Sequence, residues 1–186
     1  SGTLSAYSIR YNYFGQNSPQ FPTRGLVIRS NFNYFFKSPD SNDAYPQGEA
    51  TASYSHIFAE KNVAVVRGGG GTTFGDHAGP LQQFTLGGLF KLGGFGRDEL
   101  RGDDYLFGEA GYMRRLYRLP PFLGGSIFAG GWFDMGSTFN RWRDASLNVS
   151  GTSGLLMETR FGPLFVGGAW GEGGRTRFYF SLGRIF

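Results

Sequence analysis

The chain has 186 residues, of which 40% are hydrophobic, 18% aromatic and 17% charged, with a net charge of +4. This composition excludes a disordered chain, because the apolar surface is ample and the charge is low. The absence of cysteine excludes a disulfide framework, and no apolar run of about 18 residues marks a transmembrane helix. The positive charge suits an anionic surface but is too small to indicate a nucleic-acid partner, so we expect none.

The length fits one domain, residues 1–186. The chain starts at Ser1 with neither an initiator methionine nor a basic and apolar leader, so we interpret it as a mature or excised segment. Its 32 glycines and many aromatic residues indicate a wall with one apolar side and one polar side.

Alternation of apolar and polar residues is the main structural signal. Leu26, Ile28 and Phe32 lie at even positions, whereas Arg29 and Asn31 lie at odd ones. Repetition of this pattern predicts strands near residues 4–14, 25–36, 49–59, 62–72, 103–116, 124–135, 151–161, 163–172 and 177–186. No segment is predicted to be a helix.

The connections between these strands alternate between short and long. The short ones lie near residues 60–61, 119–121 and 162–163, and the long ones near residues 37–48, 73–102 and 136–150. Short turns on one rim and long loops on the other are typical of a transmembrane β-barrel. We therefore predict an all-β transmembrane antiparallel β-barrel with eight or nine strands in this chain. A soluble β-sandwich, which also has alternating strands, is the alternative.

The last predicted strand places Phe178, Phe180 and Leu182 on one face, and the chain stops at Phe186. This strand, although interrupted by Arg184, resembles the C-terminal signal by which bacterial outer-membrane barrels are delivered to their assembly machinery. The resemblance implies location in a bacterial outer membrane. The implied partners are outer-membrane lipid, lipopolysaccharide and the barrel assembly machinery.

The long segment 73–102 carries a second resemblance. Phe84-Thr85-Leu86-Gly87-Gly88 is followed by Leu92, Gly93, Gly94 and Phe95. This pattern resembles the loop motif of the outer-membrane-protein-85 superfamily, also called the bacterial surface antigen family. In that family the loop folds back into the lumen, and its tip usually reads apolar-Arg-Gly-aromatic. The resemblance implies a lumen loop at about residues 73–102.

Three further stretches resemble the same family, in the same order along the chain. QFPTRG resembles its short turn, and contains Phe21, Pro22, Arg24 and Gly25. GEAGYMRRL resembles the strand after the loop, with Glu109 at the inward acid position. FDMG resembles the next strand, where an inward acid, here Asp134, contacts the loop tip.

The sequence departs from the family at the loop tip, where Gly93 replaces the usual arginine. In the family this arginine pairs with the inward acids through charge-assisted hydrogen bonds. We expect Arg97 or Arg101 to pin the loop by reaching Glu109 or Asp134; the alternative is that both arginines are solvated. The missing arginine resembles the patatin-like autotransporter branch more than the assembly protein.

The family closes its barrel with 16 strands, whereas eight strands leave a lumen that side chains nearly fill. A loop of about 30 residues needs a wider lumen than that. We therefore expect this chain to be part of a larger 16-stranded barrel, completed by a missing segment, or one half of a homodimer of barrel segments. A closed eight-stranded barrel is the alternative.

Catalytic, metal and cofactor signals are weak. The sequence has no Gly-x-Ser-x-Gly elbow, and His56 and His77 do not stand at zinc-site spacing. The run from Gly68 to Gly71 is not followed by the lysine and hydroxyl residue of a phosphate-binding loop. We therefore predict no enzyme activity, no metal and no cofactor. The stretch RWRD at residues 141–144 would either contact lipopolysaccharide phosphates or form a solvated loop tip.

These features together predict an outer-membrane translocator or pore domain that secretes or anchors an attached passenger polypeptide. Its polar lumen would be gated by the loop, with Glu109 and Asp134 holding the loop in place. The alternative is a stand-alone small barrel that acts as a structural or surface-binding protein.

Overall fold

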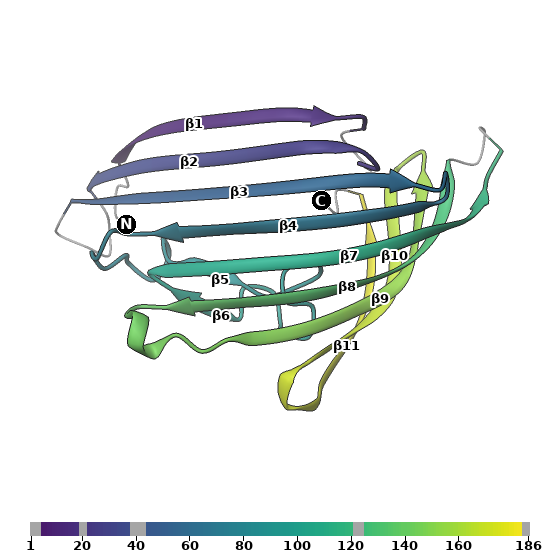
Figure 1. The fold of residues 1–186 in the computed structure, drawn as a ribbon. Coiled ribbons are helices and arrows are strands. Elements are labelled where there is room, and N and C mark those ends of the chain that lie inside the picture. Colours follow the sequence, from purple (N-terminus) through teal and green to yellow (C-terminus); the bar gives the residue numbers. More distant parts are fainter. Residues whose placement is uncertain (1–4, 19–21, 38–43, 121–124, 184–186) are drawn as a thin grey trace.

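Nine long antiparallel strands pair in the order in which they follow one another along the chain. The computed structural model describes residues 5–18, 22–37, 44–120 and 125–183. The long strands are β1 (Ser5–Gln16), β2 (Gly25–Lys37), β3 (Tyr45–Phe58), β4 (Asn62–Thr72), β7 (Asp104–Arg118), β8 (Ser126–Phe139), β9 (Asn148–Thr159), β10 (Gly162–Gly171) and β11 (Arg175–Leu182). They form one curved wall, which Figure 1 views from its convex side.

Four short elements lie outside this sheet. The strands β5 (Phe84–Leu86) and β6 (Leu100–Gly102) pair with each other, and η1 (Trp142–Asp144) and η2 (Glu172–Gly174) are single 3-10 turns. Within the described residues, no helix is long and apolar enough to cross a membrane.

The prediction of an all-β chain with eight or nine antiparallel strands is confirmed, and the described residues contain nine in the main sheet. The strands are longer than predicted where hydrogen-bonded pairing continues past the apolar alternation. β8 extends to Phe139 and β9 begins at Asn148, because Gly136 still pairs with Asn148. The sequence did not predict β5, β6 or the two 3-10 turns. The predicted strand ends at residues 4, 124 and 184–186 lie outside the described residues.

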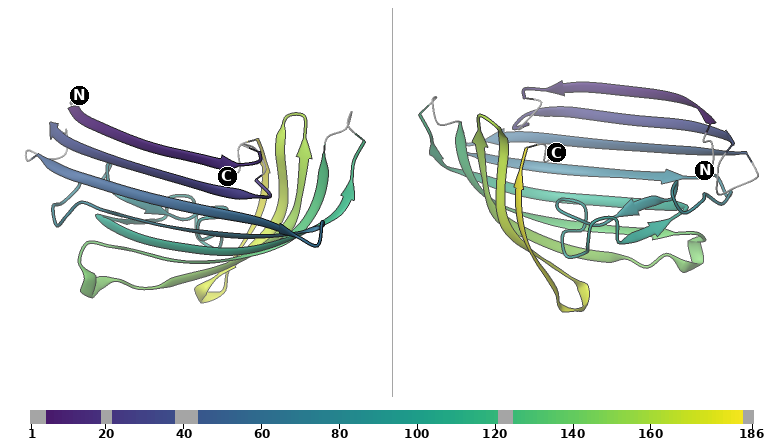
Figure 2. Two further views of the ribbon diagram at one scale, coloured as in Figure 1. Left: turned by 45° about the horizontal axis from the view of Figure 1, so that its top comes forward. Right: turned by 180° about the vertical axis from the view of Figure 1, so that it is seen from behind.

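The sheet is open. The strand order runs from β1 to β11, and in the described residues each of these two strands pairs with one neighbour only. The chain by itself therefore does not form the closed eight-stranded barrel that the sequence left as an alternative. Figure 2 shows that β9 to β11 curve around toward the concave side, which leaves a trough.

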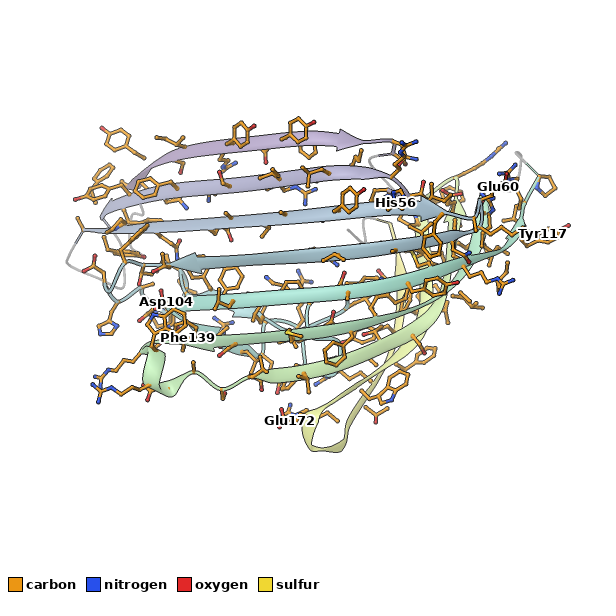
Figure 3. All side chains as sticks on the ribbon, viewed as in Figure 1. His56, Glu60, Asp104, Tyr117, Phe139 and Glu172 are labelled. Carbon is orange, nitrogen blue, oxygen red and sulfur yellow. The ribbon has the colours of Figure 1, made fainter. Side chains whose placement is uncertain are left out.

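The two ends of the strands differ in the length of their connections. One rim carries the long connection between β4 and β7 and the connection between β8 and β9, near Asp104 and Phe139 in Figure 3. The other carries short turns such as the one at Glu60, with His56 and Tyr117 nearby. We call these the long-loop rim and the short-turn rim.

The strand registers separate charge from apolar surface. On β8, Phe133 and Met135 face outward and are 49% and 43% exposed, whereas Trp132 and Asp134 face inward and are buried. Following the registers across the sheet, Asp104 and Arg114, near the two ends of β7, are the outward Asp, Glu, Lys or Arg residues among the described strand side chains. The inward positions carry Arg10, Arg29, Glu49, Arg67, Glu109, Arg115, Arg118, Asp134, Glu158, Arg175 and Arg177.

The hydrophobic core lies on the concave side, between the wall and the segment that joins β4 to β7. Inward residues such as Val63, Met113 and Leu156 pack there with Phe90 of that segment. A second cluster joins Leu86 and Leu92 of the segment to Tyr105 of the wall. Both clusters therefore join the wall to the connecting segment.

Candidate functional site

The segment from Thr73 to Asp103, which we call the inward loop, lies against the concave face of the sheet (Figure 2, right). β5 and β6 form its stalk, with Phe84 paired to Gly102 and Leu86 to Leu100. Residues 87–99 form its tip. This is the segment for which the sequence resemblance implied a lumen loop, and the structure places it on the concave face of an open sheet.

The tip is a compact turn that depends on glycine. The Gly87 amide donates to the Lys91 carbonyl at 2.9 Å, and the Gly88 amide donates to the Phe95 carbonyl at 3.2 Å. Gly87 has a φ of 121°, and a Cβ there would overlap the carbonyl oxygen of Gly96. The glycine-rich sequence thus folds the tip back on itself without side chains in the way.

Phe90 anchors the tip to the wall. Its side chain is 1% exposed and packs edge-on against Trp132 and Phe165, with ring centroids 4.7 and 5.1 Å apart. The loop-motif residues Leu92 and Phe95 are also buried, in the cluster with Tyr105. Burial of large apolar side chains of this kind stabilises docking by about 1.5–3 kcal/mol each.

Gly93 and Gly94 bring the loop backbone into direct contact with the wall. The Gly93 amide donates to Asp134 Oδ2 at 3.3 Å, and the Gly94 amide donates to Ser150 Oγ at 2.7 Å. The Tyr179 hydroxyl donates to the Gly93 carbonyl at 2.7 Å. These contacts come from β8, β9 and β11, so three strands of the wall bind two loop residues.

The fit explains why an arginine is absent at Gly93. A Cβ there would lie 2.5 Å from Thr152 Oγ1 and 2.9 Å from the Cβ of Ala169. A Cβ on Gly94 would overlap the backbone of Gly171. At this position the backbone N–H of Gly93, and not a side chain, contacts Asp134.

The two inward acids are opposite each other in the register of β7 and β8. Glu109 is 3% exposed and Asp134 is 0% exposed. Arg67 of β4 lies in register with Glu109, and its guanidinium donates to both carboxylate oxygens at 2.7 Å. Asp134 accepts from the Gly93 amide, and its Oδ1 is buried with no hydrogen-bond partner. One cation therefore serves a pair of buried acids.

The structure corrects the expected source of that cation. Arg97 is 92% exposed and lies 3.6 Å from Asp98, while Arg101 donates to the carbonyl of Pro80. Neither arginine reaches Glu109 or Asp134, because the tip turns residues 96–99 toward β11. Arg67 was missed because it lies 42 residues from Glu109 in sequence and becomes adjacent only through the register of β4 with β7. The sequence signal that could have found it is that Arg67 lies at the same alternating positions of its strand as Val63 and Val65, which predicts that all three face inward.

Glu99 ties the tip to the last strand. Its carboxylate accepts from the Gly96 amide at 2.5 Å and from Arg175, and Arg177 lies 3.5 Å away. The guanidinium of Arg175 also lies over the ring of Phe95, 4.8 Å from its centroid. The Gly96 N–H and the Arg175 guanidinium together lower the pKa of Glu99 below its usual 4.5. No sequence pattern predicted this contact, whose partners are 76 residues apart.

The base of the inward loop is fixed at the long-loop rim by Asp103. This residue is 2% exposed, and its Oδ1 accepts from the backbone N–H of Ala78 and from the side-chain Nε2 of Gln83, each at 3.2 Å. His77 Nδ1 lies 2.7 Å from the same carboxylate, and its ring is largely exposed. The described residues contain no group of three or more His, Asp or Glu side chains that could hold a metal ion.

The predicted turn motif lies on the short-turn rim. Phe21 lies outside the described residues. The Arg24 amide donates to Asn17 Oδ1 at 3.0 Å, and Pro22 precedes the start of β2. Gly25 has a φ of 122°, and a Cβ there would overlap the carbonyl of Gly15, so the turn requires glycine.

The predicted assembly-signal residues lie on the outward face of the edge strand β11. Phe178 is 77% exposed, Phe180 69% and Leu182 54%. Phe186 lies outside the described residues. His56 also faces outward, with its ring nitrogen 3.5 Å from the Tyr54 hydroxyl.

The concave face has a second region that the inward loop does not cover. There, inward side chains of β1 to β3 line a polar hollow of about 320 Å³ that includes Arg10, Asn12, Arg29, Glu49 and Thr51. The inward loop therefore fills one part of the trough, and the other part is polar and open.

The pairing of Arg67 with Glu109 is testable by a double-mutant cycle. We expect Arg67→Met to lower the free energy of unfolding by about 3 kcal/mol, because it leaves a buried carboxylate without a cation. Adding Glu109→Gln should restore much of that loss. Denaturant unfolding in detergent measures the free energy of unfolding of the single and double variants. Arg97→Met is the control and should change the free energy of unfolding by less than about 0.5 kcal/mol. An equal loss in Arg67→Met and Arg97→Met would contradict the pairing of Arg67 with Glu109.

The Glu99 contact makes docking of the tip depend on pH. The pKa of Glu99 is lower in the folded state than its usual 4.5. The stabilisation from its ionised carboxylate is therefore complete above about pH 4.5 and is lost as the pH falls through the lower folded-state pKa. We expect the amides of residues 94–99 to lose protection from hydrogen exchange as the pH falls, after correction for intrinsic rates. In the Glu99→Gln variant, the same amides should be weakly protected from exchange at every pH. Equal acid sensitivity in the variant would assign the effect to another group.

No protein-family model matches the chain, and a search of the curated proteins finds no match. The geometry of the wall and the inward loop is therefore the basis for a functional assignment.

Proposed function

We propose that this chain is part of the wall of a bacterial outer-membrane β-barrel, with the inward loop lying in its lumen. The separation of charge between the two faces carries this proposal. Outward positions in the middle of the strands have no Asp, Glu, Lys or Arg among the described residues, whereas the inward positions hold both signs of charge. An apolar outer band around a polar interior is the pattern of transmembrane barrels.

A soluble β-sandwich would place its apolar face against a second sheet. The described residues contain no second sheet on the convex side, where Tyr11, Leu155 and Phe180 are 59%, 50% and 69% exposed. Exposed apolar surface on this scale favours contact with lipid or another protein over contact with water.

The number of strands constrains how the wall closes. Because nine antiparallel strands alternate in direction, β1 and β11 run the same way. Pairing β1 with β11, within one chain or with a second copy related by the barrel axis, would create a parallel contact. A second copy rotated by 180° about an axis perpendicular to the barrel axis would place its long-loop rim beside the short-turn rim of the first copy. A separate segment with an odd number of strands closes the wall with antiparallel pairs throughout, and seven would complete the 16 strands that the resemblance implies.

Closure by such a segment makes the chain a pore or translocator domain that secretes or anchors an attached passenger polypeptide. The loop-filled part of the trough would restrict the lumen, and the polar hollow around Arg10 and Arg29 would supply a wet path. The exposed Phe178, Phe180 and Leu182 of β11 would meet the barrel assembly machinery. The glycine at position 93 supports the patatin-like autotransporter branch, and the role is transport without catalysis.

Adjacent positions on β3 test the membrane orientation. Ala52 faces outward in the middle of the strand, and Thr51 faces inward in the uncovered part of the trough. We expect Ala52→Arg to weaken folding into lipid vesicles by about 2–4 kcal/mol, the cost of a cation on the lipid face, and Thr51→Arg to have a small effect. Heat-modifiable electrophoretic mobility reports the folded fraction. The orientation is wrong if both variants insert alike.

Conductance tests the role of the inward loop. In protein isolated from its own membrane with its complete wall, Gly94→Leu should prevent the tip from seating, because its side chain would overlap Gly171. We expect larger and more variable single-channel conductance than in the wild type. Arg97→Gln, in the exposed part of the tip, should conduct like the wild type. Absence of conductance in all three would favour a structural or surface-binding barrel.

A further inference from the structure

The polar hollow of about 320 Å³ lies on the concave face, in the part of the trough that the inward loop does not cover. Its charged, amide and hydroxyl side chains come from β1, β2 and β3, and the strand registers arrange them in two rows across the sheet. The first row is Arg10, Asn31 and Glu49, and the second row is Asn12, Arg29 and Thr51. Each arginine is therefore paired with uncharged residues in the described sheet.

The two arginines of the hollow are not neutralised by an acid. Within the described residues, no Asp or Glu oxygen lies within 4.0 Å of Arg10 or Arg29. Arg10 lies on the edge strand β1, whereas Arg29 lies on β2, between two described strands. The guanidinium carbon of Arg29 lies 5.6 Å from the centroid of the Phe14 ring. A segment that closes the wall beside β1 would not come next to Arg29 in the sheet.

The acid of the hollow, Glu49, has other partners. Its Oε2 accepts from the Tyr105 hydroxyl at 3.3 Å. The Lys91 ammonium of the inward loop lies 5.7 Å from the centroid of the same tyrosine ring, and this ammonium and the Glu49 carboxylate attract each other. In the loop-filled part of the trough, by contrast, Arg67 is bound by Glu109. The uncovered hollow is therefore left with an excess of positive charge.

We propose that this hollow binds a phosphate-type oxyanion through Arg10 and Arg29. The planar guanidinium group donates N–H bonds in a geometry that matches phosphate oxygens. The Asn12 amide and the Thr51 hydroxyl line the same hollow and supply uncharged donors. Because a phosphate carries more negative charge than a carboxylate, it gains more from two guanidinium groups.

The site also deepens the proposed pore function, and this second step rests on that function. The inward loop would restrict one part of the lumen, so ions would pass through the uncovered part and meet Arg29. Arginine side chains that line a pore favour the passage of anions over cations. The open part of the trough would therefore conduct anions in preference to cations.

Binding is tested with inorganic phosphate and the protein isolated from its own membrane in detergent, with its complete wall. The phosphorus magnetic resonance line of the free ion broadens when the ion exchanges with a site on a large particle. We expect Arg10→Gln combined with Arg29→Gln to weaken phosphate binding about tenfold at constant ionic strength. Glu49→Gln should strengthen it, because the acid of the hollow repels the ion. Acetate should compete only weakly.

The matched control is Arg114→Gln, which removes an arginine from the outward face of β7. This variant loses the same charge as Arg29→Gln but should bind phosphate like the wild type. Heat-modifiable electrophoretic mobility shows that each variant is folded before its binding is compared.

Selectivity is measured on the same preparations in planar bilayers, from the reversal potential in a potassium chloride gradient. We expect the wild type to prefer chloride, and Arg29→Gln to lower the ratio of chloride to potassium permeability about twofold or more. Glu49→Gln should raise this ratio, and Arg114→Gln should leave it unchanged.

Equal phosphate broadening in the wild type and in the Arg10→Gln, Arg29→Gln double variant would overturn the oxyanion site. Weaker binding in Glu49→Gln, or competition by acetate as strong as that by phosphate, would also overturn it. A wild-type preference for potassium, or an unchanged ratio in Arg29→Gln, would overturn the anion path alone. If phosphate binds as expected but the complete wall does not conduct, the site stands and the proposed pore function fails.

Discussion

An antiparallel ladder places successive side chains on opposite faces, and in this chain that geometry keeps charge on the concave face. Backbone hydrogen bonds pair nine strands side by side, so the charged side chains in the middle of the strands share the concave face. A one-residue slip in any strand would put its charges on the convex face. Every contact of the inward loop depends on this register, since Asp134, Ser150 and Tyr179 reach the loop only as inward residues of different strands.

The inward loop shows how a missing side chain can be replaced by backbone. Where a loop arginine would need room, Gly93 and Gly94 lie directly against the wall and use their N–H groups. Neutral N–H donors do not neutralise two buried acids. Arg67 supplies the charge from within the wall, at Glu109. Docking is completed by apolar burial of Phe90 and by the contacts of Glu99 with the last strand.

The strands and their connections were predictable from the sequence because period-two alternation is a local property. The family resemblance predicted an inward position for the 73–102 segment and for Glu109 and Asp134. The source of the cation did not, because Arg67 and Glu109 meet only through a register between strands that are far apart in sequence. The extension of β8 and β9 also depended on pairing, which continues through residues such as Asn148 that carry no apolar signal.

The most direct test is the environment of each side chain of β3 in a bilayer. The chain has no cysteine, so single cysteines at residues 45–58 can be spin-labelled one at a time. Power-saturation measurements would compare access to oxygen, which dissolves in lipid, with access to a water-soluble nickel chelate. We expect oxygen access at even positions, and nickel access at the odd positions that line the open part of the trough, such as Glu49 and Thr51. Loss of that alternation, or nickel access at both faces, would contradict the proposed orientation of the wall.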